Sequence, residues 1–192
     1  MSYAARWQEA FFDVVRHPDA ARKLRDSSLN ADMATWTAAL TDAVVEACVK
    51  LGWTTSAKGH RHELLPESRS EYLSLDIMAF SEAESRWRFP VAAMELENSS
   101  KDDRIAYSLW KVICVRTDLR AVFCYRKESD AGAPLVRHLT EEVVRALPLD
   151  KRVGIEGETL VIVGSRGGAA TFPYGYFKWW RLDLQTGSFQ LF

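Results

Sequence analysis

The sequence is poor in cysteine and contains no long apolar run. Its three cysteines, Cys48, Cys114 and Cys124, form no CxxC pair and no Cys/His cluster with the spacing of a zinc site. We interpret them as buried free thiols in a reducing compartment. No segment approaches the roughly 18 to 20 apolar residues of a membrane-spanning helix, and the N-terminus lacks the apolar core of a signal peptide. The sequence therefore predicts a soluble, cytoplasmic protein.

A net positive charge is also absent. Lys and Arg number 25 against 26 Asp and Glu, which gives a formal charge of −1. This balance excludes a protein that coats nucleic acid through charge alone, although it leaves room for a local basic groove. The 192 residues are 47% hydrophobic and 27% charged, a composition typical of a folded globular chain rather than a disordered one. We expect one domain that spans residues 1–192.

Hydrophobic spacing along the chain predicts an α/β fold. Three- and four-residue spacing indicates helices at residues 3–26 with an interruption at Pro18, and at 32–51, 102–117 and 140–147. Apolar runs and alternation indicate strands at residues 53–66, 71–80, 89–96, 119–125, 159–163, 177–184 and 188–192. We expect 1–51 to be a helical segment, 52–127 a core of hairpin, helix and strand, and 128–192 a C-terminal helix with strands.

Three acidic residues lie on the two strands of the expected hairpin. Asp76 interrupts an apolar run, and Glu95 and Glu97 follow the segment Ala-Ala-Met on the next strand. Since side chains alternate between the faces of a strand, Glu95 and Glu97 share a face, and pairing would bring Asp76 beside them. Close like charges either raise the pKa of the carboxyl groups or bind a cation, and Mg²⁺ needs few protein carboxylates. The alternative of acids on a solvated strand end stays open.

The order of these elements resembles the PD-(D/E)xK nuclease superfamily, which has the restriction-endonuclease-like fold. The resemblance covers residues 32–127: a helix with Glu46, a strand with Asp76, a strand with Glu-x-Glu, a further helix and a buried strand. It implies a mixed β-sheet flanked by helices, with Asp76 as the motif aspartate and Glu95 as the motif acid. Glu97 stands where the family usually has lysine, and leucine rather than proline precedes Asp76.

The resemblance further implies metal-dependent hydrolysis of phosphodiester bonds. Asp76, Glu95 and Glu46 would hold Mg²⁺, or Mn²⁺ in its place, and Glu97 would be a further ligand or would position the attacking water. Because the motif lysine is absent, another cation must supply its charge. Lys101, directly after the motif, and Lys111, on the following helix, are both candidates.

Loop residues supply the expected contacts to nucleic acid, for which Lys and Arg dominate affinity. These are Lys58, Arg61, Arg86 and Arg88, although loop charges can also be merely solvated. We expect the nucleic acid to be DNA in preference to RNA. The resemblance alone suggests a homodimer. A catalytically inactive protein of the same fold, acting as a partner-binding or regulatory module, is the alternative function. A glycosidase with paired carboxylates is a third, weaker hypothesis, because the sequence places few aromatic residues beside these acids.

Overall fold

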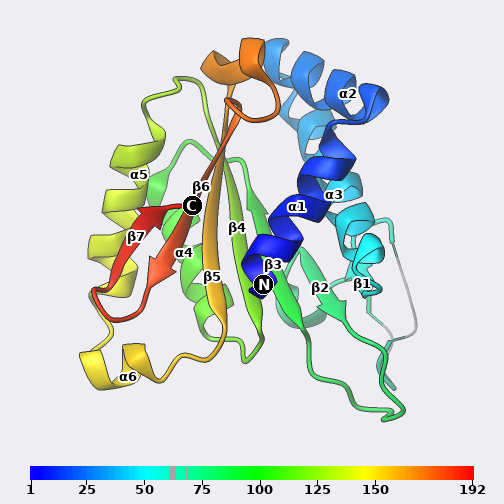
Figure 1. The fold of residues 1–192 in the computed structure, drawn as a ribbon, viewed down its shortest axis with the longest axis vertical. Helices are drawn as coiled ribbons and strands as arrows, with labels where there is room; N and C mark the ends of the chain where they lie inside the picture. The colour runs from blue at the N-terminus through cyan, green and yellow to red at the C-terminus, as the bar shows by residue number, and fades with distance from the viewer. Residues whose placement is uncertain (61–63, 68) are drawn as a thin grey trace.

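The fold was analysed in a computed structural model, which describes residues 1–60, 64–67 and 69–192. One seven-stranded sheet runs through the molecule in the order β1 to β7, with helices on both of its faces (Figure 1). β1 to β3 are antiparallel neighbours, β3, β4 and β5 are parallel, and β5 to β7 are again antiparallel. The strands are β1 (Thr54–Ala57), β2 (Ile77–Phe80), β3 (Ala92–Glu97), β4 (Leu119–Arg126), β5 (Glu158–Ser165), β6 (Phe177–Asp183) and β7 (Ser188–Leu191). The expected α/β class, with a mixed sheet between helices, is confirmed.

The helices form two layers, one on each face of the sheet. One layer holds α1 (Tyr3–Val15), α2 (Pro18–Leu29) and α3 (Met33–Lys50). The other holds α4 (Asp102–Ile113) and α5 (Gly132–Leu139), and the short α6 (Leu149–Val153) precedes β5. None of the described helices combines the length and the apolar character needed to cross a bilayer.

Strand alternation explains why two separate cores form. In β4, Phe123 and Tyr125 contribute to the core beneath α1 and α3, whereas Val122 and Cys124 contribute to the core beneath α4 and α5. Both faces of the central strands are thus buried, which is why these strands read in sequence as continuous apolar runs. Ala93 of β3 lies in the core beneath α4, so Glu95, two residues further, faces α4 as well.

Several expected elements differ from the observed ones. The strand expected at 71–80 is shortened to β2, because residues Tyr72–Ser74 form a 3₁₀ turn in which Leu73 and Ser74 adopt left-handed backbone angles, both with φ of 55°. Asp76 therefore precedes the strand instead of lying within it. The strand expected at 53–66 is reduced to β1 among the residues described.

The second half of the chain differs from expectation in its helices and in one cysteine. The helices α5 and α6 were not expected, and a π-helical turn at Thr140–Val144 replaces much of the helix expected at 140–147. Cys48 and Cys124 are buried as expected, but Cys114 is exposed because it follows the last residue of α4 at the surface.

A buried arginine ends α4 earlier than its apolar spacing suggests. Arg120 of β4 donates from Nε to the carbonyl oxygens of Val112 and Val115, at 3.0 and 3.1 Å, and from Nη1 to that of Glu156 at 2.7 Å. These bonds supply donors to one carbonyl group in the last turn of α4 and to two in the loops that precede β4 and β5. They also fix α4 against β4, and α4 carries the residues that reach the carboxylates of the sheet.

Candidate functional site

Asp76, directly before β2, lies beside Glu95 of the neighbouring strand β3. The antiparallel register pairs Ile77 with Met94, which places Asp76 opposite Glu95. The Asp76 amide donates to Glu95 Oε1 at 3.4 Å, and the amide of Leu96 donates to Asp76 Oδ2 at 2.7 Å. The structure therefore brings together the first two of the expected acidic residues, and backbone hydrogen bonds fix their relative position.

Glu95 is an ionisable side chain enclosed between the sheet and α4. It is 4% exposed, and Ser108 of α4 donates from Oγ to Glu95 Oε2 at 3.2 Å. Burial raises the pKa of Glu95, and the nearby charge of Asp76 raises it further, while hydrogen bonds from Lys111 and Ser108 act in the opposite direction. The site thus holds a carboxylate whose charge depends on the cation beside it.

That cation is Lys111, on the buried side of α4. Its Nζ lies 2.8 Å from Glu95 Oε1 and donates to the carbonyl oxygen of Ser74 at 2.7 Å. The left-handed turn at Ser74 directs this carbonyl toward α4, so the irregular segment before β2 contributes to the site. Lys111 is 19% exposed, which leaves part of its side chain accessible at the surface. Of the two lysines that the sequence offered, Lys111 is the one that contacts Glu95.

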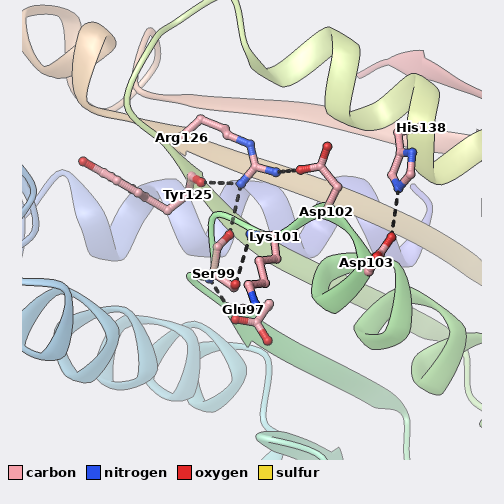
Figure 2. Close-up of polar contacts among 8 residues, drawn as sticks. All are labelled: Glu97, Ser99, Lys101, Asp102, Asp103, Tyr125, Arg126 and His138. Atoms are coloured by element: carbon pink, nitrogen blue, oxygen red, sulfur yellow. Dashed lines mark hydrogen bonds and ion pairs between the residues drawn. The ribbon is translucent and has the colours of Figure 1, made fainter.

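Glu97 and Lys101 belong to a neighbouring polar cluster at the end of β3 (Figure 2). Glu97 is half-buried, and its Oε1 accepts a hydrogen bond from the amide of Ser99 at 2.8 Å. Lys101 is exposed at the N-cap position of α4, and its amide donates to Ser99 Oγ at 3.1 Å. Glu97 therefore orders the turn into α4, a role that the sequence did not indicate.

Arg126 at the end of β4 is a site residue that sequence analysis missed. Its Nη1 donates to the carbonyl oxygen of Ser99 at 3.2 Å, and its Nη2 pairs with Asp102 in the first turn of α4. In the same region, Nε2 of His138 on α5 lies 3.8 Å from Oδ1 of Asp103. An arginine that directly ends a buried strand was the signal in the sequence. Its contacts hold the start of α4 over the ends of the parallel strands.

Glu46 does not join the other expected metal ligands. It is exposed on α3, whose buried residues pack into the core on the opposite face of the sheet from α4. Across residues 1–60, 64–67 and 69–192, no group of three or more His, Cys, Asp and Glu side chains is arranged to hold a metal ion. Of the expected ligands Asp76, Glu95 and Glu46, the structure brings Asp76 and Glu95 together and leaves Glu46 on the other side of the sheet. Two carboxylates fit Mg²⁺, which retains water and takes phosphate oxygens as its remaining ligands.

The expected basic residues do not form one surface around this pair. Lys58 is exposed directly after β1, at the same end of the sheet as Asp76, because Ala57 pairs with Ile77. Arg86 and Arg88 lie on the loop between β2 and β3, at the opposite end of both strands. Arg61 lies outside the described residues. A surface cavity of about 370 Å³ also lies at that opposite end and is lined in part by Phe89. Its lining does not include Asp76 or Glu95.

Comparisons with known proteins add no assignment to this geometry. The chain has no significant match among protein families, curated proteins or solved structures. The function must therefore be argued from the arrangement of Asp76, Glu95 and Lys111 and from the chemistry that such groups support.

Proposed function

We propose that this chain is a Mg²⁺-dependent nuclease that hydrolyses phosphodiester bonds at Asp76, Glu95 and Lys111. The observation that carries the proposal is the 2.8 Å contact between Lys111 Nζ and Glu95 Oε1. It supplies, from α4, the positive charge that is missing where Glu97 replaces the usual lysine of the motif. We propose DNA as the substrate in preference to RNA. Mn²⁺ is expected to substitute for Mg²⁺.

The topology around the site supports a restriction-endonuclease-like core. A helix, α3, precedes three consecutive antiparallel strands, and α4 then connects β3 to the parallel strand β4. Asp76 lies at the start of the middle strand and Glu95 near the end of the third. This is the arrangement of elements that the resemblance implies, although the chain continues with three further strands.

The side chains divide the chemistry between them. Asp76 and Glu95 would hold Mg²⁺, which lowers the pKa of a bound water and stabilises the charge that develops on the phosphate. Ser108 and the amide of Asp76 hold the Glu95 carboxylate in one orientation. Lys111 opposes the rise in the pKa of Glu95 that burial causes, and it would add positive charge beside the scissile phosphate. Glu97 orders the turn that precedes α4.

Hydrolysis of labelled nucleic acids tests the proposal. Single-stranded DNA, duplex DNA and RNA are incubated with the wild type and with the variants Asp76→Asn, Glu95→Gln and Lys111→Met, in Mg²⁺ and in Mn²⁺. We expect cleavage by the wild type and a loss of about a hundredfold or more in each variant. Glu46→Gln, on the other helical layer, is the matched control and should retain the wild-type rate. Circular dichroism shows whether each variant is folded.

The alternative of an inactive binding module rests on the same contact. Glu95 already has a cationic partner in Lys111 and a hydroxyl partner in Ser108, so the carboxylate is neutralised without a metal. A folded wild type that cleaves none of the substrates in either metal would contradict the nuclease proposal. A cleavage rate that is equal in the wild type and in all three variants would assign the activity to a contaminant.

A further inference from the structure

The outer face of α4 carries two large aromatic side chains that the fold leaves exposed. Tyr107 is 60% exposed and Trp110 is 53% exposed. Three residues apart on a helix, they are neighbours, and their rings stack with centroids 5.9 Å apart and an interplanar angle of 17°. Side chains of this size contribute most to stability when buried, so a stacked and exposed pair calls for a function outside the core.

Lys111 connects this aromatic pair to the carboxylates. Its Nζ lies 5.7 Å from the centroid of the Tyr107 ring and 2.8 Å from Glu95 Oε1. The same ammonium group thus contacts the aromatic surface on one side and the candidate site on the other. Arg104, also exposed, lies one turn before Tyr107 on the same helix, and Lys111 lies one turn after it. The aromatic surface is therefore bordered by two cations.

We propose that Tyr107 and Trp110 form a stacking platform for unpaired nucleobases, so that the substrate is a single-stranded nucleic acid. Flat aromatic rings bordered by cations complement a strand that offers a base face and a phosphate together. A duplex hides its base faces in its own stack, whereas a single strand exposes them. The inference deepens the proposed nuclease function and rests on it, because the platform adjoins Lys111.

The platform differs from a second exposed aromatic surface, which lies at the other end of β2 and β3. Trp87 and Phe89, which are 64% and 82% exposed, lie on the loop between β2 and β3. That loop is at the opposite end of these strands from Asp76. Trp87 is consequently a matched control for Trp110, since it is an exposed tryptophan that adjoins none of the candidate catalytic residues.

Fluorescence anisotropy with oligonucleotides separates stacking from charge. The probes are a labelled oligothymidylate, an abasic strand of the same length and charge, and a duplex of that length. Binding is measured in EDTA and again in Ca²⁺, so that the readout does not depend on cleavage. The proteins are the wild type, Tyr107→Ala, Trp110→Ala, Trp110→Phe and the control Trp87→Ala.

We expect the wild type to bind the oligothymidylate more tightly than either the abasic strand or the duplex. Each alanine variant should lose about tenfold in affinity for the oligothymidylate, with little change for the abasic strand. Trp110→Phe should retain most of the affinity, and Trp87→Ala all of it. Equal losses for both strands, or equal losses in Trp87→Ala, would overturn the stacking platform.

Two further outcomes distinguish this inference from the nuclease proposal. Base-dependent binding without any cleavage would support the platform and contradict the nuclease. Cleavage that is unchanged in the alanine variants, with no preference for the oligothymidylate, would support the nuclease and overturn the platform. A wild type that binds no oligonucleotide in EDTA or Ca²⁺ overturns the platform as well. If Trp110→Ala then abolishes self-association in light scattering, the face belongs to a second copy of the chain.

Discussion

Lys111 of α4 and Glu95 of β3 form an ion pair of 2.8 Å between the sheet and the helix that covers it. The pair is largely shielded from solvent, with side-chain exposures of 19% for Lys111 and 6% for Glu95. Asp76 adjoins it through its amide. Because Lys111 contacts Glu95 and the charge of Asp76 acts on the same carboxyl group, a change in either neighbour alters the charge balance around Glu95.

The first prediction concerns the two candidate lysines. Lys111→Met should lower the free energy of unfolding by about 2 kcal/mol, because it leaves Glu95 buried without its cation while part of the site stays open to water. Lys101→Met should change it by less than about 0.5 kcal/mol, since Lys101 is exposed. Urea unfolding provides the measurement. A double variant Lys111→Met with Glu95→Gln should recover part of the loss, and additive losses would argue against coupling between the two residues.

The second prediction concerns pH and follows from the raised pKa of Glu95. The folded protein binds the Glu95 proton more tightly than the unfolded chain, whose glutamate has its ordinary pKa near 4.5. The resulting stabilisation is complete below that value and is lost as pH rises through the higher pKa of the folded state. Glu95→Gln does not titrate, so its stability relative to the wild type should increase as pH rises through this window.

Urea unfolding of the wild type and Glu95→Gln across a pH series measures this difference directly. Carboxyl groups far from Glu95 are the same in both proteins. Their contributions to the pH dependence of the unfolding free energy therefore cancel when the two curves are subtracted. A flat difference between Glu95→Gln and the wild type, or one that falls with rising pH, would contradict the assigned direction of the pKa.

The third prediction concerns the support of α4. Arg120→Met should destabilise the fold by about 3 kcal/mol, because the carbonyl groups of Val112, Val115 and Glu156 lose the charged donor that Arg120 buries against them. Arg116→Met is the matched control: Arg116 is 82% exposed, and its pair with Glu156 spans 3.5 Å. We expect it to change the stability by less than about 0.5 kcal/mol. Thermal unfolding separates the two variants, and similar losses in both would contradict this role of Arg120.

The juxtaposition of Asp76 and Glu95 could be predicted from sequence because it depends on local rules. Alternation along a strand assigns each side chain to a face, and a hairpin brings consecutive strands together. The exact extent of β2 could not be predicted, because Leu73 and Ser74 adopt left-handed angles that non-glycine residues rarely take. The register nevertheless places Asp76 opposite Glu95.

The parts of the site that depend on how the helices dock on the sheet could not be predicted from the sequence. Whether Lys101 or Lys111 reaches Glu95 is decided by how α4 lies on the sheet, and Arg120 of the following strand, β4, holds the end of α4 in that position. Glu46 lies apart from Asp76 and Glu95 for the same reason, because α3 packs on the other face of the sheet. Helical periodicity tells which residues share a face, but not which face of the sheet that helix covers.

The most direct test of the account is a calorimetric titration of Mn²⁺ into the wild type, Asp76→Asn, Glu95→Gln and Glu46→Gln. It requires no knowledge of the substrate. We predict saturable binding by the wild type and Glu46→Gln, and loss of that binding in both Asp76→Asn and Glu95→Gln, because these two carboxylates would share one cation. Identical titrations of all four proteins up to millimolar metal would contradict a metal site at Asp76 and Glu95.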